Sequence, residues 1–336
     1  MPELRWGPLR REWVIISPER GKRPSDFRAA PGEGGGGPVA SCPFCPGNEH
    51  LTPPEIARLE GDGGWSVRVV PNKYPALSPD PGQPAPDGGG IYRRMAGLGA
   101  HEVIIDSPDH YRELDQLPLD QVERTVRMYV ARLQALGRDG RFRYVQLFKN
   151  HGREGGASLS HPHTQIIATP LIPPRVEARL EAAHGFHGRE GECLLCAIAR
   201  DERSRGERVV EESGRFLILS PYDARFPFEL LILPLAHRAD FRELSGEELS
   251  DFARVLKKTL ARLRALLGDV PYNFVLHTAP VGGGDWPRLS EWYHWHLEII
   301  PRLTRLAGFE WGSGMYINPV SPERAAEYLR GVDLGG

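Results

Sequence analysis

The feature that most constrains the fold is an internal duplication. Residues 42–167 contain, in order, CPFC, WSVRVVPNKYPAL, HEVIIDSPDH, LDQVERTVRMYVARLQALG, YVQLFKN and SHPHTQII. Residues 193–300 contain the matching series CLLC, RFLILSPYDARFP, FELLILPLAH, GEELSDFARVLKKTLARLRALLG, YNFVLHT and YHWHLEII. Because a repeated order of motifs indicates two copies of one structural unit, each motif has to be interpreted together with its counterpart.

The periodicity of each copy predicts strands around one long helix, at residues 119–137 and 246–268. The apolar residues that share a helical face are Val122, Val126, Tyr129 and Leu133 in the first copy and Leu256, Leu260, Leu263 and Leu267 in the second. β-Branched and aromatic runs bounded by Pro, Gly or Asp predict the strands. We therefore expect an α+β fold of antiparallel sheets with helices packed on one face, divided into halves 1–180 and 181–336 that join across a pseudo-twofold axis.

The composition favours a soluble globular protein and argues against two classes of partner. The formal net charge of -2, from 42 basic and 44 acidic side chains, gives no field that would attract nucleic acid or an anionic membrane. No apolar run reaches the roughly 18 residues of a membrane span, and the N-terminus lacks the apolar segment of a secretory signal. We therefore expect a cytoplasmic protein that binds neither nucleic acid nor membranes.

All four cysteines fall in two CxxC motifs, one in each copy. In a reducing compartment such pairs favour metal binding over structural disulfides. A histidine on a strand is more often a surface or core group than a ligand, but here the same residue types recur at the same stations of both copies. Two thiolates and two imidazoles form the tetrahedral set that structural zinc prefers, although iron or another ion stays open for the second set. The two predicted zinc sites are Cys42, Cys45, His110 and His161, and Cys193, Cys196, His237 and His294.

The first copy carries a further histidine that its metal set does not use. In an extended segment His161, His163 and Gln165 point to the same face. The preceding GREGGAS offers glycines whose amides can approach a phosphate closely, and a neutral imidazole held at one nitrogen is a competent nucleophile toward phosphorus. The second copy has Glu298 where the first has Gln165, and a carboxylate would repel an incoming phosphate. We therefore predict that His163 is a nucleophile and that only the first copy is catalytic.

Taken together, the motifs resemble those of galactose-1-phosphate uridylyltransferases, the two-lobed branch of the histidine-triad superfamily, along nearly the whole chain. The matching stretches are REWVIISPERGKRP, CPFCPGNE, VVPNKYPAL, SPDH, FKNHGREGGASLSHPHTQ, HWHLEIIPRL and AGFEWGSGMYINPVSPE. The resemblance implies two histidine-triad-like halves and a homodimer acting in galactose metabolism. It implies ping-pong transfer of UMP from UDP-glucose to galactose 1-phosphate through a covalent nucleotidyl-histidine on His163.

The resemblance also implies roles for individual residues. Gln165 would hydrogen-bond the transferring phosphoryl group without repelling its charge. Substrate contacts are implied for Asn150 and Ser158 at the phosphates, Asn72 on the nucleoside side, Glu310 at the hexose hydroxyls, and Arg20 and Arg23, which in the family reach a substrate from the neighbouring subunit. Each of these contact residues has a plainer alternative as a turn, loop or surface residue.

Two other functions remain open. Lys73 stands where many members of the family have an aspartate near the ribose, and GSGMYINP is closer to plant ADP-glucose phosphorylase and to a bacterial subgroup. The main alternative is therefore adenylyl transfer from ADP-glucose to inorganic phosphate. A non-catalytic, zinc-stapled nucleotide-binding protein is the remote alternative, and Gln165 and the glycine-rich approach to His163 argue against it because a scaffold needs neither.

Overall fold

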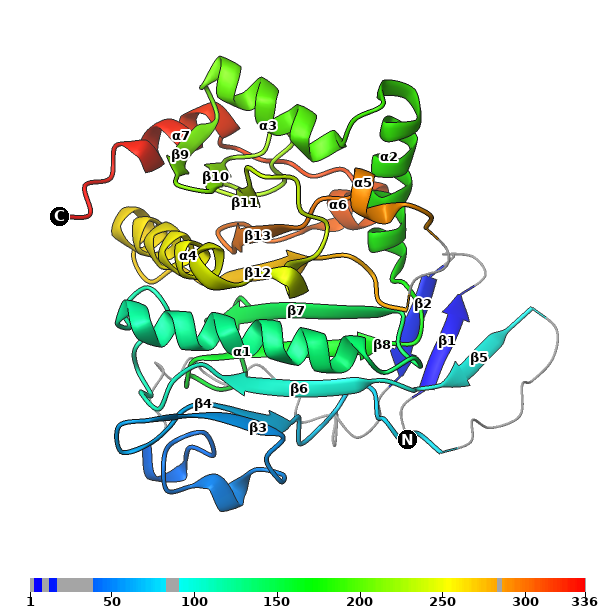
Figure 1. Cartoon of the computed structure of the whole chain (residues 1–336), viewed down its shortest axis with the longest axis vertical. Helices are drawn as coiled ribbons and strands as arrows, with labels where there is room; N and C mark the ends of the chain where they lie inside the picture. The colour runs from blue at the N-terminus through cyan, green and yellow to red at the C-terminus, as the bar shows by residue number, and fades with distance from the viewer. Residues whose placement is uncertain (1–2, 8–11, 17–38, 83–90, 283–285, 336) are drawn as a thin grey trace.

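The computed structural model describes residues 3–7, 12–16, 39–82, 91–282 and 286–335, and its centre is a ten-stranded antiparallel sheet (Figure 1). In chain order the strands are β3 (Ala57–Gly61), β4 (Gly64–Pro71), β6 (Ala100–Ile105), β7 (Tyr144–His151), β8 (His163–Thr169), β9 (Val209–Ser213), β10 (Phe216–Leu219), β11 (Leu230–Pro234), β12 (Tyr272–His277) and β13 (His296–Pro301). Their order across the sheet is β3-β4-β6-β8-β7-β12-β13-β11-β10-β9.

This order is symmetric about the contact between β7 and β12. Each copy contributes five strands, and corresponding strands stand at mirrored positions on the two sides of that contact. The two central strands pair antiparallel, with Asn150 opposite Asn273. The predicted α+β class with antiparallel pairing is confirmed, and the two expected sheets form one continuous sheet.

Two long helices cover one face of the sheet. Helices α1 (Leu119–Gly137) and α4 (Gly246–Leu267) lie side by side across it (Figure 1). The predicted apolar stripes are their buried faces, with Val122 and Leu133 on α1 and Leu256 and Leu260 on α4 inside the main core. Burying each such side chain contributes roughly 1.5–3 kcal/mol, which explains why the periodicity located both helices well.

The opposite face differs between the two halves. In the second half α2 (Pro174–Glu190) and α3 (Leu194–Arg205) pack there, with Ala199 of α3 against Leu217 and Leu231. In the first half the corresponding face carries the loop of Cys42 and Cys45. The expectation of helices on one face therefore holds for α1 and α4, while α2 and α3 add a layer that the sequence did not predict.

The remaining elements are short. They are a three-stranded sheet in the order β2 (Glu12–Ile16), β1 (Glu3–Gly7) and β5 (Arg93–Ala96), the helices α5 (Leu289–Trp292), α6 (Gly308–Ser313) and α7 (Pro322–Arg330), and the 3-10 turns η3 (Val39–Ser41), η4 (Glu49–Leu51) and η5 (Phe241–Glu243). The boundary predicted after residue 180 falls inside α2, and it stays a prediction. Among the described helices, none combines the length and apolar character needed to cross a membrane.

Candidate functional site

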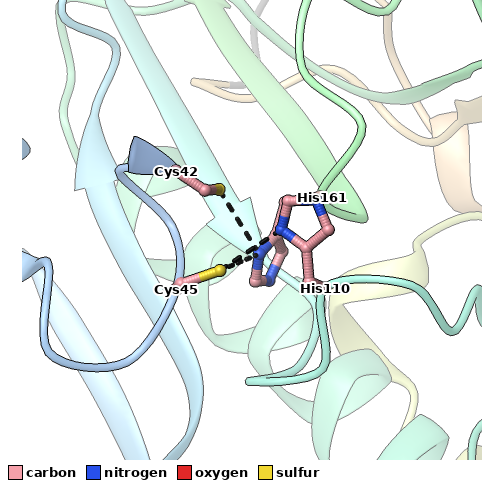
Figure 2. Close-up of side chains that lie close together, drawn as sticks. All are labelled: Cys42, Cys45, His110 and His161. Atoms are coloured by element: carbon pink, nitrogen blue, oxygen red, sulfur yellow. Dashed lines mark hydrogen bonds between the residues drawn. The ribbon is translucent and has the colours of Figure 1, made fainter. Parts of the chain in front are cut away.

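The four predicted metal ligands of the first copy converge just before β8 (Figure 2). Cys45 Sγ lies 3.2 Å from His110 Nδ1 and 3.6 Å from His161 Nδ1. Cys42 Sγ lies 3.7 Å from the same His161 nitrogen, and all four side chains are buried. Metal–ligand bonds of about 2.3 Å to sulfur and 2.1 Å to nitrogen would separate tetrahedral S and N ligands by about 3.6 Å, so the spacing fits one tetrahedral ion.

The surroundings of this cluster leave the ring nitrogens free to bind a cation. His161 Nε2 lies 2.9 Å from the carbonyl oxygen of Ser107 and must donate to it, so the lone pair is on Nδ1, which faces the sulfurs. Burial and the contact with Cys42 raise the pKa of Cys45 to about 11. A bound cation would remove this barrier to thiolate formation, so the donor set fits a thiophilic metal ion.

The second copy reproduces the arrangement. Cys196 Sγ is 3.3 Å from His237 Nδ1 and 3.5 Å from His294 Nδ1, and Cys193 Sγ is 3.9 Å from His294 Nδ1. His237 Nε2 donates to the carbonyl of Ser290 at 2.8 Å, whereas Nε2 of His294, the counterpart of His161, is buried without a hydrogen-bond partner among the described residues. The hydrogen bond from Cys196 lowers the pKa of Cys193 to about 4 despite burial, so one thiolate forms readily.

His163 is the first residue of β8, and it presents to a cavity a ring nitrogen that is free of hydrogen bonds to the described residues. Its Nδ1 lies 2.8 Å from the carbonyl oxygen of His161 and donates to it, which leaves the lone pair on Nε2. Burial lowers the pKa of His163, and the charge of Lys149 lowers it further, so the ring is neutral and nucleophilic near pH 7. The cavity has a volume of about 970 Å³, and Asn150 and Ser158 also line it.

The second half helps to position the wall of this cavity that carries Asn150. Asn273 on β12 donates through Nδ2 to Asn150 Oδ1 at 2.8 Å and to the Gly155 carbonyl at 2.6 Å. A Cβ atom at residue 155 would lie 2.1 Å from the carbonyl oxygen of His151, so only glycine fits this turn. The glycine-rich loop is therefore held against the cavity by a residue of the other copy.

Gln165 is oriented by a histidine that the sequence analysis missed. Ala76 N donates to His101 Nδ1 at 3.1 Å, which places the ring proton on Nε2. That nitrogen donates to Gln165 Oε1 at 2.9 Å, so the NH₂ group of the amide points away from His101. The Asn72 amide lies 3.2 Å from the same His101 nitrogen. A histidine in the apolar run HEVII was the available signal.

Three other predicted contacts are not brought to His163. Arg20 and Arg23 lie outside the described residues. Glu310 lies on α6, where its Oε2 accepts a hydrogen bond from Ala307 N at 3.1 Å. Glu310 is not among the described residues that line the His163 cavity, and neither Asn72 nor Gln165 is among them. The roles implied for Arg20, Arg23 and Glu310 stay predictions, as do those of the other predicted site residues.

The histidine that corresponds to His163 in the second copy is engaged. Arg179 Nη1 lies 3.1 Å from His296 Nε2, and because a guanidinium only donates, the ring lone pair is occupied. Arg179 Nη2 donates to Glu298 at 2.8 Å, and Arg225 donates to the same carboxylate at 3.1 Å. His277, His296 and Glu298 lie close enough to hold a metal ion, but these two guanidinium groups already neutralise the carboxylate. We assign no metal there.

Comparison with known proteins gives concordant matches. The model of the galactose-1-phosphate uridyl transferase N-terminal domain matches residues 1–173, and that of its C-terminal domain matches residues 179–312. ADP-glucose phosphorylase of Arabidopsis thaliana is 37% identical over 99% of this chain and 93% of the relative. Galactose-1-phosphate uridylyltransferase of Thermotoga maritima is 35% identical over 99% of both chains.

Solved structures agree over the full length. The crystal structure of the Arabidopsis thaliana ADP-glucose phosphorylase with bound ADP-glucose matches with a TM-score of 0.77 and 34% identity, covering 99% of this chain and 100% of the other. A solved structure of uridylyltransferase matches with a TM-score of 0.81 and 33% identity, covering 98% of this chain and 97% of the other.

Proposed function

Because this chain belongs to the galactose-1-phosphate uridylyltransferase family, we propose that it moves UMP from UDP-glucose to galactose 1-phosphate through a covalent intermediate on His163. The observation that supports this most directly is the free Nε2 of His163, which faces the cavity while Nδ1 is held by the His161 carbonyl. On this proposal residues 1–180 form the catalytic half and residues 181–336 the supporting half.

The chemistry balances without an outside proton donor. The Nε2 lone pair of His163 forms a bond to the α-phosphorus, and the bond from that phosphorus to the bridging oxygen breaks, so glucose 1-phosphate leaves with the electron pair. The ring keeps its Nδ1 proton and carries a positive charge. A phosphate oxygen of galactose 1-phosphate then attacks phosphorus, the N–P bond breaks, and its electron pair returns to Nε2.

The surrounding polar groups would bind and orient the phosphates. The Gln165 NH₂ group, aimed by His101, donates to the transferring phosphoryl group, and Asn150 and Ser158 contact the phosphates from the cavity wall. Asn72 would contact the nucleoside. These donors are neutral, so they stabilise anionic oxygens without repelling them.

We propose zinc at both Cys2His2 sets, where it would fix the fold around His161 and His294. His161, if bound to zinc, would anchor the backbone whose carbonyl orients His163, and the ion would have a structural role only. The S–N spacings of 3.2–3.7 Å in the first set support a tetrahedral ion. Elemental analysis is expected to find two zinc ions per chain, and a value well below one would refute both sites.

The family also guides the proposal for the whole assembly. We propose a homodimer in which Arg20 and Arg23 reach the neighbouring subunit's substrate, while Glu310 binds hexose hydroxyls. Four cysteines assigned to metal rather than to disulfides are in keeping with a cytoplasmic location.

A second candidate is an ADP-glucose phosphorylase, which would transfer AMP through the same histidine to inorganic phosphate. The full-length identity of 37% to the Arabidopsis thaliana enzyme and the match to its ADP-glucose-bound structure favour this candidate. A non-catalytic nucleotide-binding protein would have no use for a free histidine nitrogen beside an oriented glutamine.

A nucleotide-sugar panel separates these candidates. The protein is mixed with UDP-glucose or ADP-glucose alone, and denaturing mass spectrometry detects nucleotidylated protein, with His163→Ala as the control. Galactose 1-phosphate or inorganic phosphate is then added to discharge the adduct. A UMP adduct discharged by galactose 1-phosphate supports the first candidate. Consumption of ADP-glucose with UDP-glucose untouched would refute it, and the absence of any adduct would refute transfer altogether.

A further inference from the structure

Behind His163, on the side of the sheet covered by α1, lies a buried ionic cluster that the transfer chemistry does not use. The Lys149 side chain is fully buried, and its Nζ lies 2.9 Å from Asp106 Oδ2 and 3.0 Å from Glu113 Oε2. Thr164 Oγ1 donates to Asp106 Oδ2 at 3.2 Å and accepts from the Tyr129 hydroxyl at 2.6 Å, and the Tyr129 oxygen lies 3.1 Å from Asp106 Oδ1. The cluster therefore joins β6, β7, β8 and α1.

A gain in stability is a weak reason for retaining this cluster. Removing a lysine and two carboxylates from water costs several kcal/mol for each ion, and apolar side chains of similar volume often stabilise a core equally well or better. A buried ionic cluster therefore points to some requirement besides the fold.

The duplication supplies an internal comparison. Strand register places Lys149 opposite Thr164, and the equivalent pair in the second copy is Leu276 opposite Leu297. Asp106 follows Ile105, which faces His163, and the register of β11 with β13 puts Pro234 at the equivalent place. Both copies share the strand framework, yet the polar positions occur only behind the histidine with a free Nε2.

The cluster holds three consecutive residues of the nucleophile segment. The carbonyl of Pro162 accepts a hydrogen bond from Asp106 N at 3.2 Å. The carbonyl of His163 accepts one from Lys149 Nζ at 3.3 Å, and Thr164 donates to the Asp106 carboxylate. The backbone on both sides of the nucleophile is thus tied to Lys149 and Asp106.

We propose that Lys149, held by Asp106 and Glu113, is a positioning residue that fixes the backbone of His163 for attack on phosphorus. This inference rests on the proposed nucleotidyl transfer. A misplacement of about 1 Å at a reacting group can lower the rate roughly a hundredfold. Holding the backbone of His163 rigidly would therefore increase the rate of attack.

The test compares Lys149→Met with the double variant Lys149→Met/Asp106→Asn. The single variant removes the lysine charge that Asp106 and Glu113 share, so both buried carboxylates lose this cationic partner. It should therefore lose both stability and nucleotidylation rate. The double variant removes one charge of each sign, and Glu113 keeps His151 as a partner at 2.9 Å. We expect it to regain the wild-type melting temperature and zinc content while its single-turnover nucleotidylation stays about 10- to 100-fold slow, with KM within about threefold of wild type.

The matched control is Lys258→Met, which removes an exposed lysine of α4 that pairs with Glu211 at 2.6 Å. It should leave every measured quantity unchanged. A double variant that regains both stability and wild-type nucleotidylation would overturn the inference, because the cluster would then serve the fold alone. Wild-type protein that forms no adduct would instead refute the proposed function, so the two failures are distinguishable.

Thr164→Val provides a second variant if the double variant does not fold. It is nearly isosteric and removes the hydroxyl that donates to Asp106. A several-fold slower nucleotidylation at unchanged KM and zinc content would support the inference. Wild-type kinetics in this variant would count against it, because a segment that keeps its rate without this tether is not held by the cluster.

Discussion

The two copies of the repeat keep the same metal geometry but treat the histidine that follows it differently. In both, a CxxC pair meets two histidines, and one of these in each copy, His161 in the first and His237 in the second, donates its outer nitrogen to a backbone carbonyl. In the first copy Nε2 of His163 faces a cavity, whereas in the second copy Arg179 occupies Nε2 of His296 and Glu298 replaces the glutamine. On the proposed function, the two copies therefore share one scaffold, and reactivity would depend on a few residues around one imidazole.

The largest expected effect separates the two imidazoles directly. His163→Ala should lower nucleotidyl transfer by at least about 10⁴-fold, because no other group can form the covalent intermediate, and it should keep two metal ions and the wild-type fold. His296→Ala should change the rate only a few-fold, because its Nε2 is already bonded to Arg179. Steady-state rates and intact-mass adducts measure both.

The outcome that breaks the comparison is a nearly active His163→Ala protein. Loss of the adduct in His296→Ala with retention in His163→Ala would reverse the roles of the two copies.

The second largest expected effect distinguishes the metal-binding role of His161 from the nucleophilic role of His163. His161→Ala removes one of four metal ligands, so it should lose one zinc ion and several kcal/mol of stability together with activity. His294→Ala should also lose one zinc ion and stability. The fraction of this variant that is folded should still form the nucleotidyl adduct. Elemental analysis, thermal melts and adduct mass on the same samples test this. Full zinc content in His161→Ala would show that the ligand set is wrong.

The sequence predicted those features that depend on residues close together in the chain. Helix 119–137 and the strands that flank it were predictable because the apolar periodicity is local, and the membership of the family was predictable because long motifs carry it. The metal sets were found because the repeat displays each one twice. Cys42 and His161 are far apart in the sequence, so nothing local shows that they meet. The recurrence of the same residue types in the second copy indicated it instead.

The rest depended on contacts that no local pattern encodes. Lys149 sits in the strand-like run YVQLFKN, and nothing there indicates that Asp106 and Glu113 meet it. Arg179 comes from α2, whose charged sequence has few apolar positions to mark it as a helix, and it reaches His296 from another element. Side-chain pairings of this kind appear only when the sheet brings separate strands together.

The ionic cluster that distinguishes the first copy should also appear in acid stability. Burial would raise the pKa of Glu113, but the charge of Lys149 and the hydrogen bond from His151 outweigh it and lower the pKa to about 2. Because the folded pKa lies below the ordinary value of 4.5, the contribution is present above pH 4.5 and is lost as the pH falls toward 2. It amounts to about 3 kcal/mol.

Urea unfolding of wild type and Glu113→Gln between pH 7 and pH 3 tests this expectation. The difference in unfolding free energy should narrow as the pH falls below 4.5. Zinc content is followed in the same titration, since protonation of the metal ligands also destabilises both proteins. A difference that stays constant across the range would mean that the pKa of Glu113 is not lowered by folding.

The smallest effect tests whether the residue two places after each histidine sets its reactivity. Gln165→Glu gives the first copy the carboxylate of the second, and the new charge should repel the phosphoryl oxygens and accept from His101, lowering the nucleotidylation rate by about 10- to 100-fold. The matched exchange Glu298→Gln should leave the rate near wild type, because Arg179 still occupies His296. A Gln165→Glu protein as fast as wild type would show that the amide is not a phosphoryl donor, and the difference between the two copies would then rest on the freedom of Nε2 alone.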